Sequence, residues 1–190
     1  MNHIAIFASG TGSNAKKIVE YFKGHKEIKV SLVVSNKENA PVLDMARLNN
    51  IPTLVVNRDQ FYNTEDILQK ISIYKVDFIV LAGFLLLVPK YLIRSFQDRI
   101  VNIHPALLPK YGGKGMYGMN VHKAVKAANE SDSGITIHLV NEKYDEGKIV
   151  FQESCKIIPE DSPEVIADKV LQLEHRHYSK VIEKILTKEM

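Results

Sequence analysis

Apolar and polar positions follow two spacings in this chain, and the two spacings alternate along its first half. Short continuous apolar runs are typical of strands buried on both faces, whereas apolar residues three or four apart indicate helices. Strand and helix patterns in alternation predict βαβ units with right-handed crossovers, and therefore a parallel sheet. The predicted strands are 3–9, 29–34, 53–56, 77–82 and 99–104, and the predicted helices are 15–22, 40–49 and 64–74.

The second half of the chain follows a different pattern. Residues 134–140 and 149–157 each alternate apolar and polar side chains, and the stretch 141–148 between them is rich in turn formers, so we expect an antiparallel strand pair. A helix is expected over 122–129, and a closing helix over about 161–186 begins with a capping box. The chain is therefore predicted to form a single α/β domain with a mostly parallel sheet and helices on both faces.

Composition and charge narrow the class of protein. The chain has 190 residues, of which 45% are hydrophobic and 25% charged, as in one globular domain. Its net charge of +3 is dispersed, which suits an anionic small substrate better than nucleic acid. Cys155 is the single cysteine, so an internal disulfide is excluded, and we expect a buried, inert thiol. No signal peptide or membrane-span pattern is present, so we expect a cytoplasmic protein.

The strongest chemical signal is the pair Asn102 and His104 at the end of the predicted strand 99–104. Their side chains are two residues apart and point to the same side of the strand. Pro105 cannot donate to a strand ladder, so the strand should stop there and leave the pair at the carboxyl edge of the sheet, where open α/β sheets bind ligands. A histidine and an asparagine satisfied by neighbouring backbone groups remain the alternative.

Residues 9–15, Ser-Gly-Thr-Gly-Ser-Asn-Ala, form a glycine turn between the first strand and the first helix. Such a turn is typical of a phosphate site, because its N–H groups and the helix dipole both attract an anion. It also fits the dinucleotide fingerprint G-x-G-x-x-A, although the second strand ends in Ser35-Asn36 and not in the acidic residue that NAD binding favours. A plain βα turn with Ser13 or Asn14 as N-cap is the third possibility.

Two interpretations stay open for each of three further parts of the chain. Residues 83–89 stay apolar after a strand, which fits either a buried corner or the wall of a ligand pocket. Residues 110–119 contain four glycines and two tyrosines, which fits either a mobile flap or a plain loop. His122 is either a site residue or a surface residue of the first helical turn. Residues 174–178 are expected to be a solvated, charged part of the closing helix.

Taken together, these motifs resemble the phosphoribosylglycinamide formyltransferases, within the folate-dependent formyltransferase superfamily. The resemblance runs from Ile4 to about Ile185, and its motifs are specific through their order and spacing. They are Ser9-Gly10-Thr11-Gly12-Ser13-Asn14, Ser35-Asn36, Leu81-Ala82-Gly83-Phe84, Asn102-Ile103-His104-Pro105-Ala106-Leu107-Leu108-Pro109, and Asp145-Glu146-Gly147 before Ile149-Val150-Phe151-Gln152-Glu153. Formyltetrahydrofolate deformylases would carry an extra N-terminal domain and methionyl-tRNA formyltransferases an extra C-terminal one, so the length favours the purine enzyme.

The resemblance implies a Rossmann-like formyltransferase fold and formyl transfer from 10-formyltetrahydrofolate to the amine of glycinamide ribonucleotide in purine biosynthesis. It implies a phosphate-binding half, 1–100, and a catalytic and folate-binding half, 101–190. The implied partners are these two small molecules, without nucleic acid or membrane, for a monomer or homodimer. A formyltetrahydrofolate hydrolase and an NAD-dependent oxidoreductase are the alternatives. The implied binding residues are Gly12, Ser13, Asn14 and Glu174 for the ribonucleotide, and Leu85, Leu86, Val88 and Asn102 for the folate.

The chemistry of such a reaction assigns a role to each of three residues. Attack of an amine on a formyl carbon creates an oxyanion, and the Asn102 amide can donate to it without titrating. His104 can donate to the same oxygen or move protons, because imidazole titrates near neutral pH. Asp145, carried by the loop 141–148, is expected to hold His104 in its protonated form. The reaction requires neither a metal nor a covalent intermediate.

Overall fold

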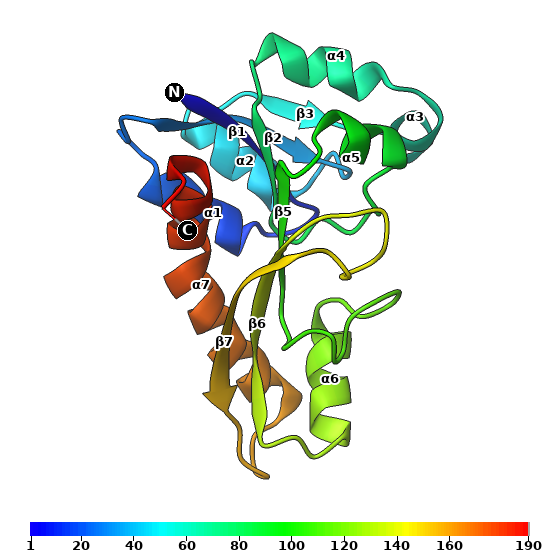
Figure 1. Cartoon of the computed structure of the whole chain (residues 1–190), viewed down its shortest axis with the longest axis vertical. Coiled ribbons are helices and arrows are strands. Elements are labelled where there is room, and N and C mark those ends of the chain that lie inside the picture. The colour runs from blue at the N-terminus through cyan, green and yellow to red at the C-terminus, as the bar shows by residue number, and fades with distance from the viewer. Residues whose placement is uncertain (190) are drawn as a thin grey trace.

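The computed structural model describes residues 1–189 and shows a seven-stranded mixed sheet with the strand order β3-β2-β1-β4-β5-β6-β7 (Figure 1). Strands β1 to β5 are parallel, whereas β6 is antiparallel to β5, and β7 to β6. This topology confirms the predicted parallel sheet with an added antiparallel pair. The strands are β1 (Asn2–Phe7), β2 (Ile28–Ser35), β3 (Thr53–Val55), β4 (Phe78–Leu81), β5 (Ile100–His104), β6 (Asp132–Leu139) and β7 (Ile149–Lys156).

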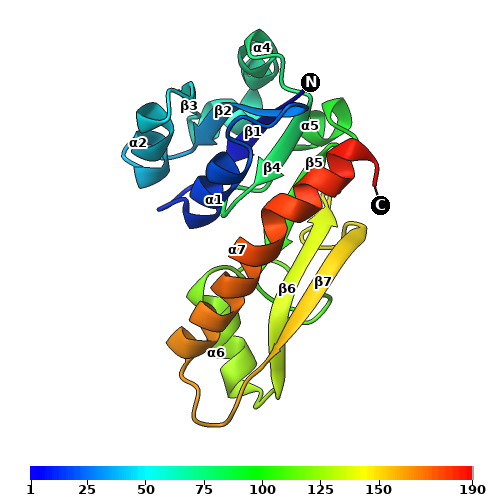
Figure 2. The ribbon, with the colours of Figure 1, turned by 90° about the vertical axis from the view of Figure 1, so that its left-hand side faces the viewer.

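Helices cover both faces of the sheet, as predicted. The core on one face includes residues of α1, α2, α6 and α7, and the core on the other face includes residues of α3, α4 and α5. The long α7 runs along β6 and β7 on the first face (Figure 2). The helices are α1 (Ser13–Tyr21), α2 (Pro41–Leu48), α3 (Arg58–Asn63), α4 (Asp66–Ile73), α5 (Lys90–Ser95), α6 (Met119–Ala127) and α7 (Pro163–Thr187). None of them, within residues 1–189, is long and apolar enough to cross a membrane.

Alternation along the strands decides which core each side chain joins. In β1, Ile4 and Ile6 pack into the core on the α7 side, whereas Phe7 packs into the core on the α5 side. In β5, Ile100 belongs to the core on the α5 side. Asn102 follows Ile100 by two residues and therefore faces the same side, at the carboxyl end of the strand.

Two helices, α3 and α5, were not anticipated from the sequence. Each has six residues, which is too short for a helical period to stand out. The side chain of Asn57 caps α3 by accepting a hydrogen bond from the Asp59 N–H at 2.8 Å. The closing helix begins with a side-chain cap, because Ser162 accepts from the N–H of Val165 at the start of α7, but the expected capping box is wrong, since Val165 and not Glu164 is the third residue after the cap.

The expectation that 174–178 would be solvated is wrong for two of its residues. Glu174 and Tyr178 are both buried, Tyr178 with 1% of its surface exposed. The Tyr178 hydroxyl lies 2.8 Å from the Leu81 carbonyl oxygen and 3.2 Å from that of Val101. The single O–H of Tyr178 is shared between these two carbonyl oxygens, so α7 is held at the ends of β4 and β5 by a polar contact as well as by apolar packing.

Tyr178→Phe tests this anchor. The substitution keeps the ring and removes the hydroxyl from two buried carbonyls, so we expect the free energy of unfolding to fall by about 1–2 kcal/mol. Thermal denaturation should show a Tm about 3–6 °C lower. Tyr74→Phe, at the half-buried end of α4, is the control. An unchanged Tm in Tyr178→Phe would mean that the hydroxyl does not stabilise the position of α7.

Candidate active site

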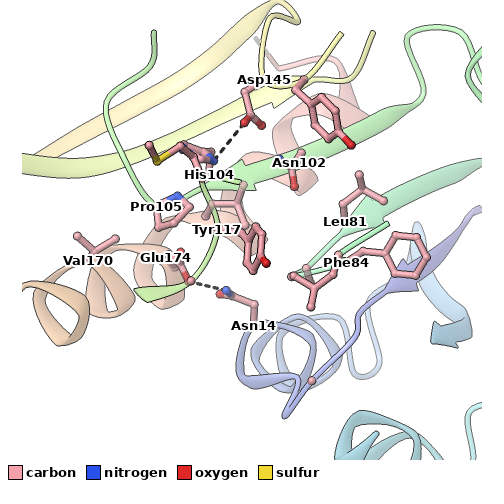
Figure 3. Close-up of a pocket in the computed structure, with 18 of the residues that line it drawn as sticks. Asn14, Leu81, Phe84, Asn102, His104, Pro105, Tyr117, Asp145, Val170 and Glu174 are labelled. Carbon is pink, nitrogen blue, oxygen red and sulfur yellow. Dashed lines mark hydrogen bonds and ion pairs between the residues drawn. The ribbon is translucent and has the colours of Figure 1, made fainter. Parts of the chain in front are cut away.

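One cavity of about 730 Å³ opens at the carboxyl ends of β1, β4 and β5. The loop after β1, the apolar loop after β4, the end of β5, the glycine-rich segment before α6, the loop between β6 and β7, and one side of α7 all contribute to its lining. Figure 3 shows residues from these elements side by side. All ten residues predicted for catalysis or binding line it: Gly12, Ser13, Asn14, Leu85, Leu86, Val88, Asn102, His104, Asp145 and Glu174.

Asn102 is paired with a histidine that the sequence did not reveal. Asn102 and His138 lie opposite each other in the β5–β6 register, and Nδ2 of Asn102 lies 3.2 Å from Nε2 of His138. Nδ1 of His138 lies 3.1 Å from the Leu139 carbonyl oxygen, which can only accept. A tautomer with its proton on Nδ1 lets Nε2 accept one N–H of Asn102, whereas a proton on Nε2 would instead face Oδ1 of Asp145, 3.6 Å away. The second N–H of the Asn102 amide is free to donate to a group in the cavity.

His104 lies between two loops and is 3% exposed. Its Nε2 lies 2.8 Å from the Tyr111 carbonyl oxygen, so the neutral ring keeps its proton on Nε2. Its Nδ1, which then carries a lone pair, lies 3.7 Å from Oδ2 of Asp145, on the side where Figure 3 draws the carboxylate. Burial lowers the pKa of His104 below its ordinary value, although Asp145 and the Tyr111 carbonyl oppose this. The expectation that Asp145 keeps His104 protonated is therefore wrong for the free protein.

Asp145 joins three segments of the site. Its Oδ2 accepts the Gly113 N–H at 2.9 Å, and its Oδ1 lies 3.6 Å from Nε2 of His138. Burial by itself would raise the pKa of this carboxyl group, but the His138 and Gly113 contacts and the nearby His104 hold the pKa below its usual value. Asp145 is thus an anion beside a neutral His104, and it gains an ion pair if His104 accepts a proton.

A second polar pair lies at the other end of the cavity, where the loop after β1 meets α7. Nδ2 of Asn14 donates to Oε2 of Glu174 at 2.6 Å, as Figure 3 shows, and Oδ1 of Asn14 is buried without a partner in the described chain. The N-cap of α1 is Gly12 without a side-chain hydrogen bond, so the third possibility for this turn, with Ser13 or Asn14 as N-cap, is wrong. Gly12 has a φ of 74°, and a Cβ there would lie 2.4 Å from Val42, so glycine is required.

The apolar loop after β4 is a wall of this cavity. Phe84 anchors it, with its ring edge-to-face against Phe7 and Phe61 in the core. The Leu85 N–H donates to Oγ of Ser9 at 2.9 Å, which connects this loop to the loop after β1. Leu85 is half exposed, so its side chain is available to a ligand. Of the two interpretations of 83–89, the pocket wall fits the structure.

The glycine-rich segment and α6 close another side of the cavity. Gly113, Met116 and Tyr117 line it, and the tyrosine ring points toward the interior in Figure 3. His122 also lines it and is 6% exposed, so the surface interpretation of His122 is wrong. Burial and the nearby His104 lower the pKa of His122. In residues 1–189, no group of three or more His, Cys, Asp or Glu side chains is arranged to hold a metal ion.

Comparison with known proteins decides the family. The model of the formyl transferase family matches residues 2–182. The chain belongs to the formyl transferase family. Among curated relatives of this formyl transferase, phosphoribosylglycinamide formyltransferase of Bacillus subtilis is 33% identical over 191 residues, which cover 98% of this chain and 95% of the relative. The chloroplastic phosphoribosylglycinamide formyltransferase of Arabidopsis thaliana is 45% identical over 188 residues and 94% of this chain.

The chain spans 63% of the length of the Arabidopsis relative and 59% of that of the Vigna unguiculata relative. Solved structures agree with the fold over nearly the whole chain. Phosphoribosylglycinamide formyltransferase from Bacillus halodurans matches with a TM-score of 0.88 and 33% identity, covering 100% of this chain and 97% of the other. These similarities confirm the predicted family and the predicted fold of this formyl transferase.

Sequence reasoning missed His138 and left the place of His122 open, for different reasons. His138 alternates with Thr136 in β6, but the sequence does not reveal which residue of β5 lies opposite it. His122 follows a segment whose glycines hide the start of α6, which begins at Met119. The expected helix start at residue 122 placed this histidine in a first turn, whereas it lies one turn into the helix.

Burial of the Glu174 carboxylate leads to a prediction about stability. Burial raises the pKa of Glu174, although the Asn14 amide opposes this, so its charged form destabilises the folded state as pH rises through that pKa. Glu174→Gln removes this cost, and we expect a Tm about 2–4 °C higher at pH 8, with a smaller gain at pH 5. Thermal denaturation at both pH values measures it, with the exposed Glu160→Gln as control. A Glu174→Gln protein less stable than the parent at pH 8 would contradict the argument.

Proposed function

We propose that this formyl transferase moves the formyl group of 10-formyltetrahydrofolate to the amine of glycinamide ribonucleotide, by direct attack through a tetrahedral intermediate, in purine biosynthesis. The observation that carries the proposal is one cavity with a glycine-turn anion site at one end and Asn102, His104 and Asp145 near its middle. The names of the Bacillus subtilis and Arabidopsis relatives support the same substrate.

The ribonucleotide is proposed to bind across the loop after β1 and α7. Gly12, Ser13 and Asn14 begin α1, where backbone N–H groups and the helix dipole favour a phosphate. Glu174 would accept hydrogen bonds from the hydroxyl or amine groups of the substrate, in place of the one it accepts from Asn14. In this proposal residues 1–100 supply the phosphate site, and Glu174 comes from the second half of the chain.

The folate is proposed to lie against the apolar loop after β4. Leu85, Leu86 and Val88 line the cavity there and offer an apolar surface to a flat ring, while the backbone groups of the loop offer hydrogen bonds to its polar edge. Asn102 lies at the adjoining end of β5 and would contact the formyl group. In this arrangement the formyl carbon of the folate would face the amine of the ribonucleotide.

Proton transfer follows from the protonation states of the site. As the amine attacks the formyl carbon, the second N–H of Asn102 donates to the developing oxyanion. Neutral His104 has a lone pair on Nδ1 and accepts the proton that the amine loses, and Asp145 stabilises the imidazolium formed. The same proton then goes to the folate nitrogen as its bond to carbon breaks. The products are the formylated amide and tetrahydrofolate.

Calorimetry with separate ligands tests this proposal against an NAD-dependent oxidoreductase. The glycine turn alone permits both, but β2 ends in Ser35, and Asn36 beyond it accepts a hydrogen bond from Ser9, so no acidic side chain takes that position. We expect binding of glycinamide ribonucleotide and of a folate analogue that cannot transfer a formyl group, and no binding of NAD⁺ at the same concentration. Binding of NAD⁺ alone would reject formyl transfer.

A further inference from the structure

Tyr111 connects His104 to a polar cluster on the surface of the protein. Its backbone carbonyl oxygen accepts from Nε2 of His104 at 2.8 Å, while its side-chain hydroxyl donates to Oε1 of Glu130 at 2.8 Å. Lys110 also reaches Oε1 of Glu130, at 2.8 Å. Glu130 lies after the end of α6 and is partly buried, and it does not line the cavity. One residue, Tyr111, therefore carries both a contact to the buried histidine and a contact to Glu130.

The backbone of Tyr111 has an unfavourable conformation that contacts of its side chain must hold in place. Its φ is 57°, in the left-handed region where a residue with a Cβ is strained by roughly 1 kcal/mol or more. A conformation of this kind persists only when surrounding interactions hold it. The ring of Tyr111 packs against the core on the α7 side, and its hydroxyl is held by Glu130. Rotation out of this conformation would turn the carbonyl oxygen away from His104.

We propose that Glu130 is a positioning residue, which holds Tyr111 so that its carbonyl oxygen fixes the orientation and the tautomer of His104. Without that carbonyl, His104 could carry its proton on Nδ1, and the lone pair would then no longer face Asp145. Lys110 also bonds to Glu130, but its removal leaves the Tyr111 hydroxyl bonded to Glu130. Lys110 therefore has no such role. The positioning role of Glu130 rests on the proposed function only for its expected effect on kcat.

The direction of the effect on His104 follows from the groups that face it. Asp145 comes from the loop between β6 and β7, His138 from β6, His122 from α6, and the Tyr111 carbonyl from the glycine-rich segment. The carbonyl and Asp145 raise the pKa of His104, whereas burial and His138 lower it. Loss of the carbonyl contact should therefore lower the pKa of His104 further. If neutral His104 is the base, the acid limb of the kcat profile moves to lower pH.

The test compares Tyr111→Phe, Glu130→Ala and Glu130→Gln with Lys110→Met in the full chain. NMR titration of the histidine rings, with the His104 signal identified by its absence from His104→Asn, measures the pKa of His104 without any turnover. We expect a lower pKa of His104 in Tyr111→Phe and Glu130→Ala, and the parental value in Lys110→Met. Glu130→Gln keeps an acceptor for the Tyr111 hydroxyl, so the pKa of His104 in this variant should lie close to the parental value.

Turnover is measured on the same proteins. We expect kcat to fall about tenfold in Tyr111→Phe and Glu130→Ala, with KM for both substrates near the parental value, and near-parental kcat in Lys110→Met. Parental His104 titration in Tyr111→Phe would overturn the proposal, as would an equal change in Lys110→Met. If His104 titrates as expected but no variant or parent transfers a formyl group, the positioning role stands and the proposed function fails.

Discussion

Asn102→Ala is expected to lower kcat for formyl transfer by about 10²–10³-fold, the usual cost of losing one oxyanion donor. The amide donates one N–H to His138 and has a second N–H free for the cavity, and alanine supplies neither. Because the proposed contacts of the ribonucleotide with Gly12, Ser13, Asn14 and Glu174 do not involve Asn102, we expect its Kd to change less than threefold. Steady-state kinetics and calorimetry on the same preparation separate the two quantities.

Asn63→Ala, at the exposed end of α3, is the matched control and should keep the parental kcat. A loss of His138 orientation would also follow from Asn102→Ala, so His138→Asn belongs in the same series. If Asn102→Ala retained more than a tenth of the parental kcat, the amide would not be the main oxyanion donor.

Asp145→Asn is expected to lower kcat by roughly 10²-fold, at the low end of the usual contribution of a proton-transfer group. Asparagine can still accept the Gly113 N–H, so the loop should keep its place, but no anion would then stabilise a protonated His104. Since the carboxylate raises the pKa of His104, its removal should also move the acid limb of the kcat profile to lower pH. A kcat profile from pH 5 to 9 measures both effects.

Glu146→Gln is the control for charge in this loop, because Glu146 is exposed and pairs with Lys143 at 3.0 Å. It should leave the profile unchanged. An acid limb that moved to higher pH in Asp145→Asn would mean that the carboxylate does not face the base, and a kcat within threefold of the parent would remove Asp145 from the mechanism.

The sequence predicted the sheet and the placement of the site because both follow from local periodicity. Asn102 and His104 share a side at the carboxyl end of β5, as a period of two requires, and the loops that surround them end or begin at glycine and proline signals. The family resemblance then named the substrates. In contrast, the pairing of Asn102 with His138, 36 residues further along the chain, depends on the register of two strands, which local patterns do not encode.

The sequence also did not reveal which ionisable side chains are buried, or how burial changes their charge. Glu174 lies in a stretch of α7 whose sequence indicates a charged, solvated face, yet it is buried where α7 packs on α1, and Asn14 of α1 donates a hydrogen bond to it. The charge of His104 was mispredicted for a related reason. Its nearness to Asp145 was foreseen, but its 3% exposure was not, and the burial that lowers its pKa outweighs the carboxylate. Both errors arise from desolvation, which only packing in three dimensions sets.

The most direct test of the account measures the fate of the formyl group. The protein is mixed with 10-formyltetrahydrofolate, with and without glycinamide ribonucleotide, and both free formate and formylated ribonucleotide are quantified over time. Direct transfer predicts one formylated ribonucleotide for each folate consumed, and negligible formate when the ribonucleotide is left out. Release of formate at the same rate with and without glycinamide ribonucleotide would contradict it and identify a hydrolase.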